Sequence, residues 1–367
     1  MINKFKKIVI KIGSSSIVNE KSKKIKTGWL HSICNDINYM HPNQKIIIVC
    51  SGAIALGSKM INNKKTLRRL EDKQAAAAVG QIELANCWQQ ELKKHKINAA
   101  QILLTLEDSE VRRRYLNARK TINALHKQNI IPIINENDTV ATEEIRFGDN
   151  DRLAARVAQM IDANLLILLS DVDGLYAENP SQNKKAKKIN EVFKINSTIE
   201  KMGSANQSTL GSGGMTTKIW AAKICMNSGC STVIAHSKKK HPLQNITKNN
   251  STWFHAAKSP ESSRKQWILN HLHSSGIVII DQGALKAIEN NKSLLPAGVI
   301  QIKGRFNRGD VISILSNKNI KIGIGVIAYD SDDSKKIVGK NSKDIKDILG
   351  YEGRDELIHK DDLVKVK

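Results

Sequence analysis

The sequence has few aromatic residues and no long apolar run. Phe, Trp and Tyr make up 4% of the 367 residues, so the core must consist mainly of Ile, Leu, Val and Ala. No apolar stretch approaches the roughly 20 residues that a membrane-spanning helix needs. The short apolar start of the chain is interrupted by Lys11 and has no cleavage site of the kind that follows a signal peptide. We therefore expect a cytoplasmic protein without a membrane anchor.

Paired cysteines and arginine are also scarce. The five cysteines are scattered and form no C-x-x-C motif, which argues against a zinc site and is typical of reduced cytosolic thiols. The net charge is +23, but Lys supplies 45 of the 58 basic residues and Arg only 13. A surface that binds phosphates or base edges favours Arg. The charge therefore indicates compositional drift more than a nucleic-acid-binding face.

Short apolar runs alternate with stretches of helical periodicity in the first 258 residues. Buried β-branched runs that alternate with helices are typical of a parallel sheet covered on both faces. We expect strands within 7–13, 45–52, 99–105, 130–138, 164–174 and 231–237, and helices within 71–95, 115–128, 151–162 and 215–228. The pattern predicts an α/β fold with a mostly parallel central sheet sandwiched by helices.

The last quarter of the chain has a different character. Residues 276–367 contain closely spaced short strands with turn residues between them, a pattern typical of a small β-barrel with one or two helices. Residues 259–275 are polar and indicate a linker. The sequence therefore predicts one domain at 1–258, a linker at 259–275 and a small β-barrel-like domain at 276–367.

Polar residues follow the expected strands of the first domain. Ligands of open parallel sheets bind beyond the carboxyl ends of the strands. Each group of polar residues on its own could be turn chemistry, since Ser, Asn, Asp and Gly dominate turns. These strand ends carry Lys11 and Gly13–Ser16, then Ser51, then Asn135 and Asp138, and finally Ser170 and Asp171. Four such ends at one edge of a sheet favour a binding site.

Two further stretches add chemistry to this edge. "GSGGMTTK", residues 211–218, is a glycine-rich loop that runs into a helix carrying Lys218, and backbone N–H groups at a helix start bind phosphate oxygens. It is not a Walker A loop. "GDND", residues 148–151, precedes another expected helix, and a helix cap needs only one such residue. Taken alone, Asp149, Asn150 and Asp151 indicate a helix cap, and only the company of the other motifs favours a site there as well.

Together these motifs resemble the amino acid kinase family. The resemblance rests on "KIGSS" from Lys11, "CSGAIALG", "NENDTVATEEIRFGDNDRLAA", "SDVDGLY" and "GSGGMTTK". Within that family the motifs are most similar to those of the glutamate 5-kinases, and "SLLPAGVIQIKGRFNRGDVISI" resembles a PUA domain, an RNA-binding type of module. The resemblance implies a transferase that uses ATP and Mg²⁺ to phosphorylate the γ-carboxylate of L-glutamate to L-glutamyl 5-phosphate, the first step of proline biosynthesis.

The resemblance also implies roles for individual residues. Lys11 and Lys218 would be catalytic cations, and Asp151 would organise them. The acceptor would bind to Ser51, Asp138 and Asn150, supported by Asn135 and Asp149. ATP would bind to Lys11, Ser170, Asp171, Ser212, Gly213, Gly214, Met215, Thr216, Thr217 and Lys218. Glu144, in the loop 139–147, would tune inhibition by proline, and no metal site formed by the protein alone is expected.

The resemblance further implies partners and leaves alternatives open. It implies a homo-oligomer, either a dimer or a tetramer, handover of the product to glutamate-5-semialdehyde dehydrogenase, and RNA as a partner of the PUA domain. Aspartate, N-acetylglutamate, carbamate and UMP kinases share the fold, but Asp138 favours an acceptor with a free α-ammonium group. An RNA-binding protein with a degenerate kinase domain is the second alternative. It is disfavoured by the near balance of 16 basic and 13 acidic residues in 276–367.

Overall fold

A computed structural model describes residues 2–61, 69–140, 150–180, 182–183, 185–205, 214–269 and 275–365. The chain forms two compact units, Met1–Pro260 and Glu261–Lys367. None of the helices in these described ranges combines the length and the apolar character needed to cross a bilayer.

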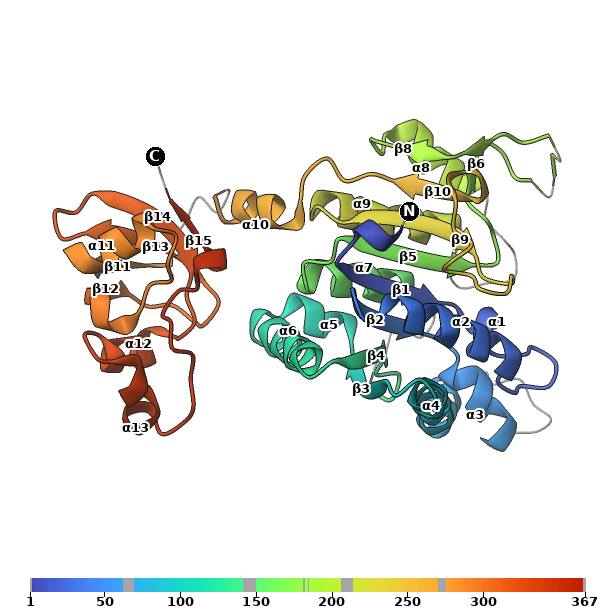
Figure 1. The fold of residues 1–367 in the computed structure, drawn as a ribbon, viewed down its shortest axis with the longest axis horizontal. Helices are drawn as coiled ribbons and strands as arrows, with labels where there is room; N and C mark the ends of the chain where they lie inside the picture. The colour runs from blue at the N-terminus through green and yellow to red at the C-terminus, as the bar shows by residue number, and fades with distance from the viewer. Residues whose placement is uncertain are drawn as a thin grey trace. The chain divides into compact units, whose positions relative to one another are not determined.

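The N-terminal unit is built around one large sheet. Within the described residues it has eight strands in the order β3-β4-β2-β1-β5-β9-β10-β8. All neighbours pair in parallel except β9 and β10, which are antiparallel. The strands are β1 (Lys7–Ile12), β2 (Lys45–Cys50), β3 (Asn98–Leu104), β4 (Ile130–Glu136), β5 (Leu165–Ser170), β8 (Glu191–Val192), β9 (Ser231–His236) and β10 (Ser251–Phe254). In Figure 1 the sheet runs through this unit from β3 to β10 and β8. A separate two-stranded sheet pairs β6 (Leu175–Tyr176) with β7 (Lys188–Ile189).

Helices cover both faces of the large sheet. They are α1 (Ser14–Ile17), α2 (Thr27–Met40), α3 (Ala53–Ile61), α4 (Leu70–Lys93), α5 (Leu106–Glu110), α6 (Arg112–Lys127), α7 (Asn150–Met160), α8 (Ser197–Ala205) and α9 (Met215–Asn227). Successive residues of a strand point to opposite faces. Ile8 and Ile10 of β1 therefore pack in one cluster with α2 and α4, whereas Val9 packs in a second cluster with α7 and α9. This double coverage explains why the strands are continuous apolar runs.

Helices α3 and α4 approach each other closely at two glycines. A Cβ atom on Gly57 would lie 1.8 Å from the carbonyl oxygen of Ala76, and one on Gly80 would lie 1.9 Å from that of Ala53. Real Cβ atoms never come so close to backbone atoms, so only glycine allows this crossing. The contact fixes the position of α4 against the start of α3. Gln81 directly follows Gly80 on α4, so its position is fixed as well.

The C-terminal unit is a smaller, mostly antiparallel sheet with short helices. The sheet order is β12-β11-β13-β14-β15, and only β11 and β13 pair in parallel. Its strands are β11 (Gly276–Ile280), β12 (Val299–Gly304), β13 (Val311–Ser316), β14 (Lys321–Val326) and β15 (Leu363–Lys365). The helices are α11 (Gln282–Glu289), α12 (Ser331–Ile337) and α13 (Ile345–Leu349), and α10 (Pro260–Leu269) begins at the boundary of the two units.

The predicted fold class is confirmed. The six strands expected in the first domain are all present, and the sheet that they form is mostly parallel and lies between helices. The two-stranded β6-β7 sheet was not expected, because strands of two residues carry too few side chains to give a period.

Candidate active site

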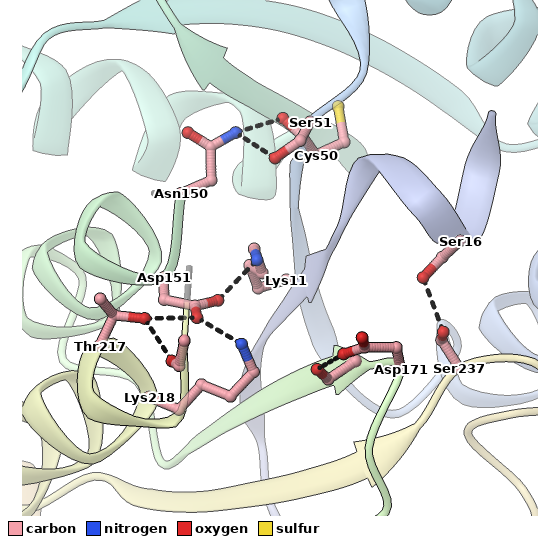
Figure 2. Close-up of polar contacts among 12 residues, drawn as sticks. Lys11, Ser16, Cys50, Ser51, Asn150, Asp151, Asp171, Thr217, Lys218 and Ser237 are labelled. Carbon is pink, nitrogen blue, oxygen red and sulfur yellow. Dashed lines mark hydrogen bonds and ion pairs between the residues drawn. The ribbon is translucent and has the colours of Figure 1, made fainter. Parts of the chain in front are cut away.

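Two lysines from distant parts of the chain converge on one aspartate. Lys11 Nζ lies 2.6 Å from Asp151 Oδ1, and Lys218 Nζ lies 2.9 Å from Asp151 Oδ2. Figure 2 shows both ammonium groups pointing towards the carboxylate, each beside a different oxygen. Thr217 Oγ1 lies 3.4 Å from the same Oδ2 atom and donates a 2.7 Å hydrogen bond to the carbonyl of Gly214.

The local structure explains why these groups meet. Lys11 is near the carboxyl end of β1, Lys218 is in the first turns of α9, and Asp151 is in the first turn of α7. All three residues are buried, and Asp151 is completely so. Burial opposes ionisation of Asp151, but attraction to Lys11 and Lys218 outweighs it and holds the pKa of this carboxyl well below its usual range. The site therefore contains a buried anion between two cations, with a net positive charge.

Asn150, the neighbour of Asp151, is the centre of a polar network. Its Nδ2 group lies 2.8 Å from both the Cys50 carbonyl and Ser51 Oγ, and 2.9 Å from Asn135 Oδ1. The first two contacts are drawn in Figure 2. Because the Asn150 side chain bonds across to β2 and β4, it joins the start of α7 to two strand ends. The structure thus brings together Ser51, Asn135 and Asn150, which were predicted separately.

The network continues into helix α4. Asn135 Nδ2 donates a 2.6 Å hydrogen bond to Gln81 Oε1, and Asn135 Oδ1 accepts from the backbone N–H of Glu136 at 2.9 Å. Gln81 was not among the residues predicted from the sequence. It lies in the run "QAAAAVGQ", which has the pattern of a buried helix face, and its partner Asn135 is 54 residues away.

Asp138 follows β4 by two residues and is only partly buried. No other described residue bonds to its carboxylate, and burial raises its pKa to about 6. An ionised carboxylate without a partner is unfavourable in such surroundings, and a cation placed beside it would relieve that cost.

The described residues predicted on the nucleotide side lie at the carboxyl end of β5 and at the start of α9. Ser170 Oγ donates to Asp171 Oδ1 at 2.9 Å, beyond β5. Gly214 precedes α9, and Met215 and Thr216 are its first two residues. The remaining predicted positions, Glu144, Asp149, Ser212 and Gly213, lie outside the described residues.

The lysine-rich segment after β9 is tied to helix α2 by a buried acid. Asp36 is completely buried and accepts from His241 Nδ1 at 2.8 Å and from the backbone N–H of Leu243 at 2.9 Å. Ser237, at the start of the segment, lies 2.7 Å from Ser16 Oγ, as Figure 2 shows. The next residue, Lys238, lines a pocket of about 350 Å³ together with Lys26 and Asp171.

Metal binding by protein side chains alone has little support in the described part of the chain. There, no three His, Cys, Asp or Glu side chains gather closely enough to hold a metal ion. Both oxygens of Asp151 are already within contact distance of lysines.

Comparison with known proteins gives the family. Residues 6–236 match the model of the amino acid kinase family, and residues 276–349 match that of the PUA domain. The chain belongs to the amino acid kinase family. As a kinase of this family it uses ATP, and its C-terminal unit is a PUA domain.

Relatives with curated names are similar over nearly the whole chain. A protein of Paramagnetospirillum magneticum named "Glutamate 5-kinase" is 47% identical over 98% of this chain and 97% of its own length. One of the same name from Sinorhizobium fredii is 50% identical over 99% of this chain and 93% of its own length. A third, from Bartonella henselae, has the same name and is 48% identical over 98% of this chain and 95% of its own length. The amino acid kinase unit and the PUA domain therefore occur together in these relatives.

Proposed function

We propose that this kinase transfers the γ-phosphoryl group of ATP to the γ-carboxylate of L-glutamate and forms L-glutamyl 5-phosphate, the first step towards proline. The observation that carries the proposal is the convergence of Lys11 and Lys218 on Asp151 at the carboxyl edge of the sheet. The names of relatives at 47–50% identity support glutamate as the acceptor.

The two lysines suit the chemistry of this transfer. Both reactants are anions, so the main requirement is positive charge on the phosphoryl group in flight. Donors that are preorganised around a transition state each contribute about 3–4 kcal/mol. Because each ammonium group contacts one oxygen of Asp151, this carboxylate holds the two cations in place before substrate binds. It need not act as a base, because a glutamate carboxyl, with a pKa of about 4.3, is already ionised at neutral pH.

The acceptor side favours an amino acid with a free ammonium group. Asp138 has no partner among the described residues, and an α-ammonium group would neutralise it. The Ser51 hydroxyl accepts from Asn150, so its own proton is available for a substrate carboxylate. An N-acetylated acceptor, carbamate or UMP lacks the cation that Asp138 would bind.

On the nucleotide side we assign Ser170, Asp171 and the start of α9 to ATP. Backbone N–H groups at the start of a helix suit phosphate oxygens. Mg²⁺ would be held by the nucleotide phosphates, with Asp151 close by, and would neutralise charge on them.

Regulation by proline is part of the proposal. Proline has a carboxylate and an ammonium group like those of glutamate, so it would compete for Asp138 and the Asn150 network. Inhibition that glutamate cannot overcome at high concentration would contradict this assignment.

The decisive experiment measures ADP release with glutamate, aspartate, N-acetylglutamate, carbamate and UMP as acceptors, and traps acyl phosphate with hydroxylamine. We expect turnover and hydroxamate formation with glutamate, and their loss in Lys218→Met. Turnover with aspartate but not glutamate would overturn the choice of acceptor. Salt-dependent binding of RNA by a chain without any phosphotransfer would instead support an RNA-binding protein.

A further inference from the structure

Gln81 carries a buried hydrogen-bond donor that the network described above does not use. The residue is about nine-tenths buried in α4, and its Oε1 accepts from Asn135. Its Nε2 is shielded from solvent and has no hydrogen-bond partner among the described residues. Leaving such a donor unpaired costs about 1–3 kcal/mol, so a buried one calls for an explanation.

The orientation of the three amides follows from backbone groups. The N–H of Glu136 can only donate, so the Asn135 atom that faces it must be the oxygen. Asn135 therefore donates through its Nδ2 to Gln81, and the Gln81 atom that accepts must be the oxygen Oε1. Turning the Gln81 amide over would place two N–H groups against each other. The unused end of Gln81 is thus a donor.

The unused donor belongs to the acceptor side of the site. Both ends of the Gln81 amide are on one carbon, so Nε2 lies beside the contact with Asn135. Asn135 in turn bonds to Asn150, which bonds to Ser51. Gln81 is therefore linked through Asn135 to Asn150, one of the residues that we assign to the acceptor.

The order of the strands indicates which end of the acceptor Gln81 meets. Asn135 is in β4 and Asp138 follows it, whereas Lys11 is on β1, and β2 lies between these strands. Neighbouring strands are about 4.8 Å apart, so the two ends of the site are separated by about 10 Å. On the proposed function, the reacting carboxylate of the acceptor lies at the lysines and its amino-acid end lies towards β4.

We propose that Gln81 Nε2 donates a hydrogen bond to the α-carboxylate of the acceptor amino acid, while Asp138 takes its ammonium group. This inference rests on the proposed function, because it requires an α-amino acid as the acceptor. Gln81 then acts through binding and orientation of the acceptor and takes no part in moving the phosphoryl group.

Two substitutions separate contact with the substrate from support of Asn135. Gln81→Glu keeps an oxygen that accepts from Asn135 and replaces the NH2 donor with a second oxygen. Gln81→Met removes the accepting oxygen and the donor together. Gln90→Met, at an exposed position of the same helix, is the matched control. KM values for glutamate and for ATP and kcat would be measured at about pH 8.5, where a carboxyl group at position 81 is ionised.

We expect Gln81→Glu to raise KM for glutamate about 10- to 100-fold, the range for loss of a hydrogen bond to a charged group. KM for ATP should stay within about twofold, which also shows that the variant is folded. Gln81→Met should be impaired as strongly, and Gln90→Met should equal the wild type. A normal KM for glutamate in Gln81→Glu, with a defect only in Gln81→Met, would overturn the inference and leave Gln81 as a support for Asn135. Failure of the wild type to phosphorylate glutamate would instead refute the proposed function.

Discussion

The guanidinium group of Arg152 lies over the ring of Trp220, with its central carbon 4.6 Å from the ring centroid. Arg152 directly follows Asp151 on α7, and Trp220 is two residues beyond Lys218 on α9. This cation–π contact therefore joins the two helices beside the ion pair between Asp151 and Lys218. It holds the position of one helix against the other where the site depends on it.

Replacing Trp220 with Leu should loosen this contact. A cation–π pair is worth about 0.5–2 kcal/mol, so we expect kcat to fall about 3- to 10-fold, with KM for glutamate little changed. Trp220→Phe should recover most of the activity, because it keeps an aromatic face. Steady-state kinetics would measure both. Lys223→Met is the control. Lys223 is on the same helix as Trp220, and its substitution removes only an exposed ion pair to Glu200, so full activity should remain.

Asp151→Asn should reduce turnover far more than glutamate binding. The amide keeps the size of the side chain but leaves the buried Lys11 and Lys218 without a counter-charge, and breaking a buried ion pair costs about 3–5 kcal/mol. We expect kcat to fall about 100- to 1000-fold and the melting temperature to drop. Kinetics and thermal unfolding would test this, and a change confined to KM would show that Asp151 belongs to the binding of the acceptor.

Binding of glutamate should depend on pH through Asp138. Burial raises the pKa of Asp138 to about 6 in the free protein, and an ammonium group binds only the ionised form. The affinity should therefore rise as the pH rises through about 6 and level off above it. We expect kcat/KM for glutamate to fall about tenfold per pH unit below that point. A profile that is flat between about pH 5 and 8 would contradict the assignment.

The same carboxyl should cost stability when no substrate is bound. Between its unfolded pKa of 3.8 and the folded value of about 6, the native state binds more protons than the unfolded state. The contribution of Asp138 to stability therefore decreases as the pH rises through this window. We expect Asp138→Asn to raise the melting temperature at about pH 8 and to weaken glutamate binding. A lower melting temperature would indicate that the carboxylate has a partner.

Gly80→Ala should disturb both stability and binding. Its Cβ atom would meet the Ala53 carbonyl oxygen at 1.9 Å and the Gly57 nitrogen at 2.6 Å, so α3 and α4 must separate. Overpacking costs about 1–3 kcal/mol or more, and the shift would displace the adjacent Gln81. Urea unfolding and KM for glutamate would measure the two effects. Gly28→Ala, on α2 with open space around the new methyl group, should be neutral or slightly stabilising.

The sequence predicted six strands of the large sheet and the edge at which polar residues gather, because buried parallel strands are unbroken apolar runs that end in polar turns. It also predicted Lys11, Asp151 and Lys218, which the structure brings together, while their chemical roles stay predictions. Gln81 and Asp36 were not predicted. Their partners are 54 and more than 200 residues away, and nothing in their local patterns distinguishes them from ordinary helical residues.

The amide network gives the site a direction. Its members, Gln81, Asn135 and Asn150, are neutral, so anion recognition at that end adds no positive charge to compete with the two lysines. On the proposed function, the acceptor docks with its α-carboxylate at these uncharged donors and its γ-carboxylate at the two lysines. On the proposed function, this arrangement of neutral donors, with Asp138 for the ammonium group, disfavours phosphorylation of the α-carboxylate before any chemistry begins.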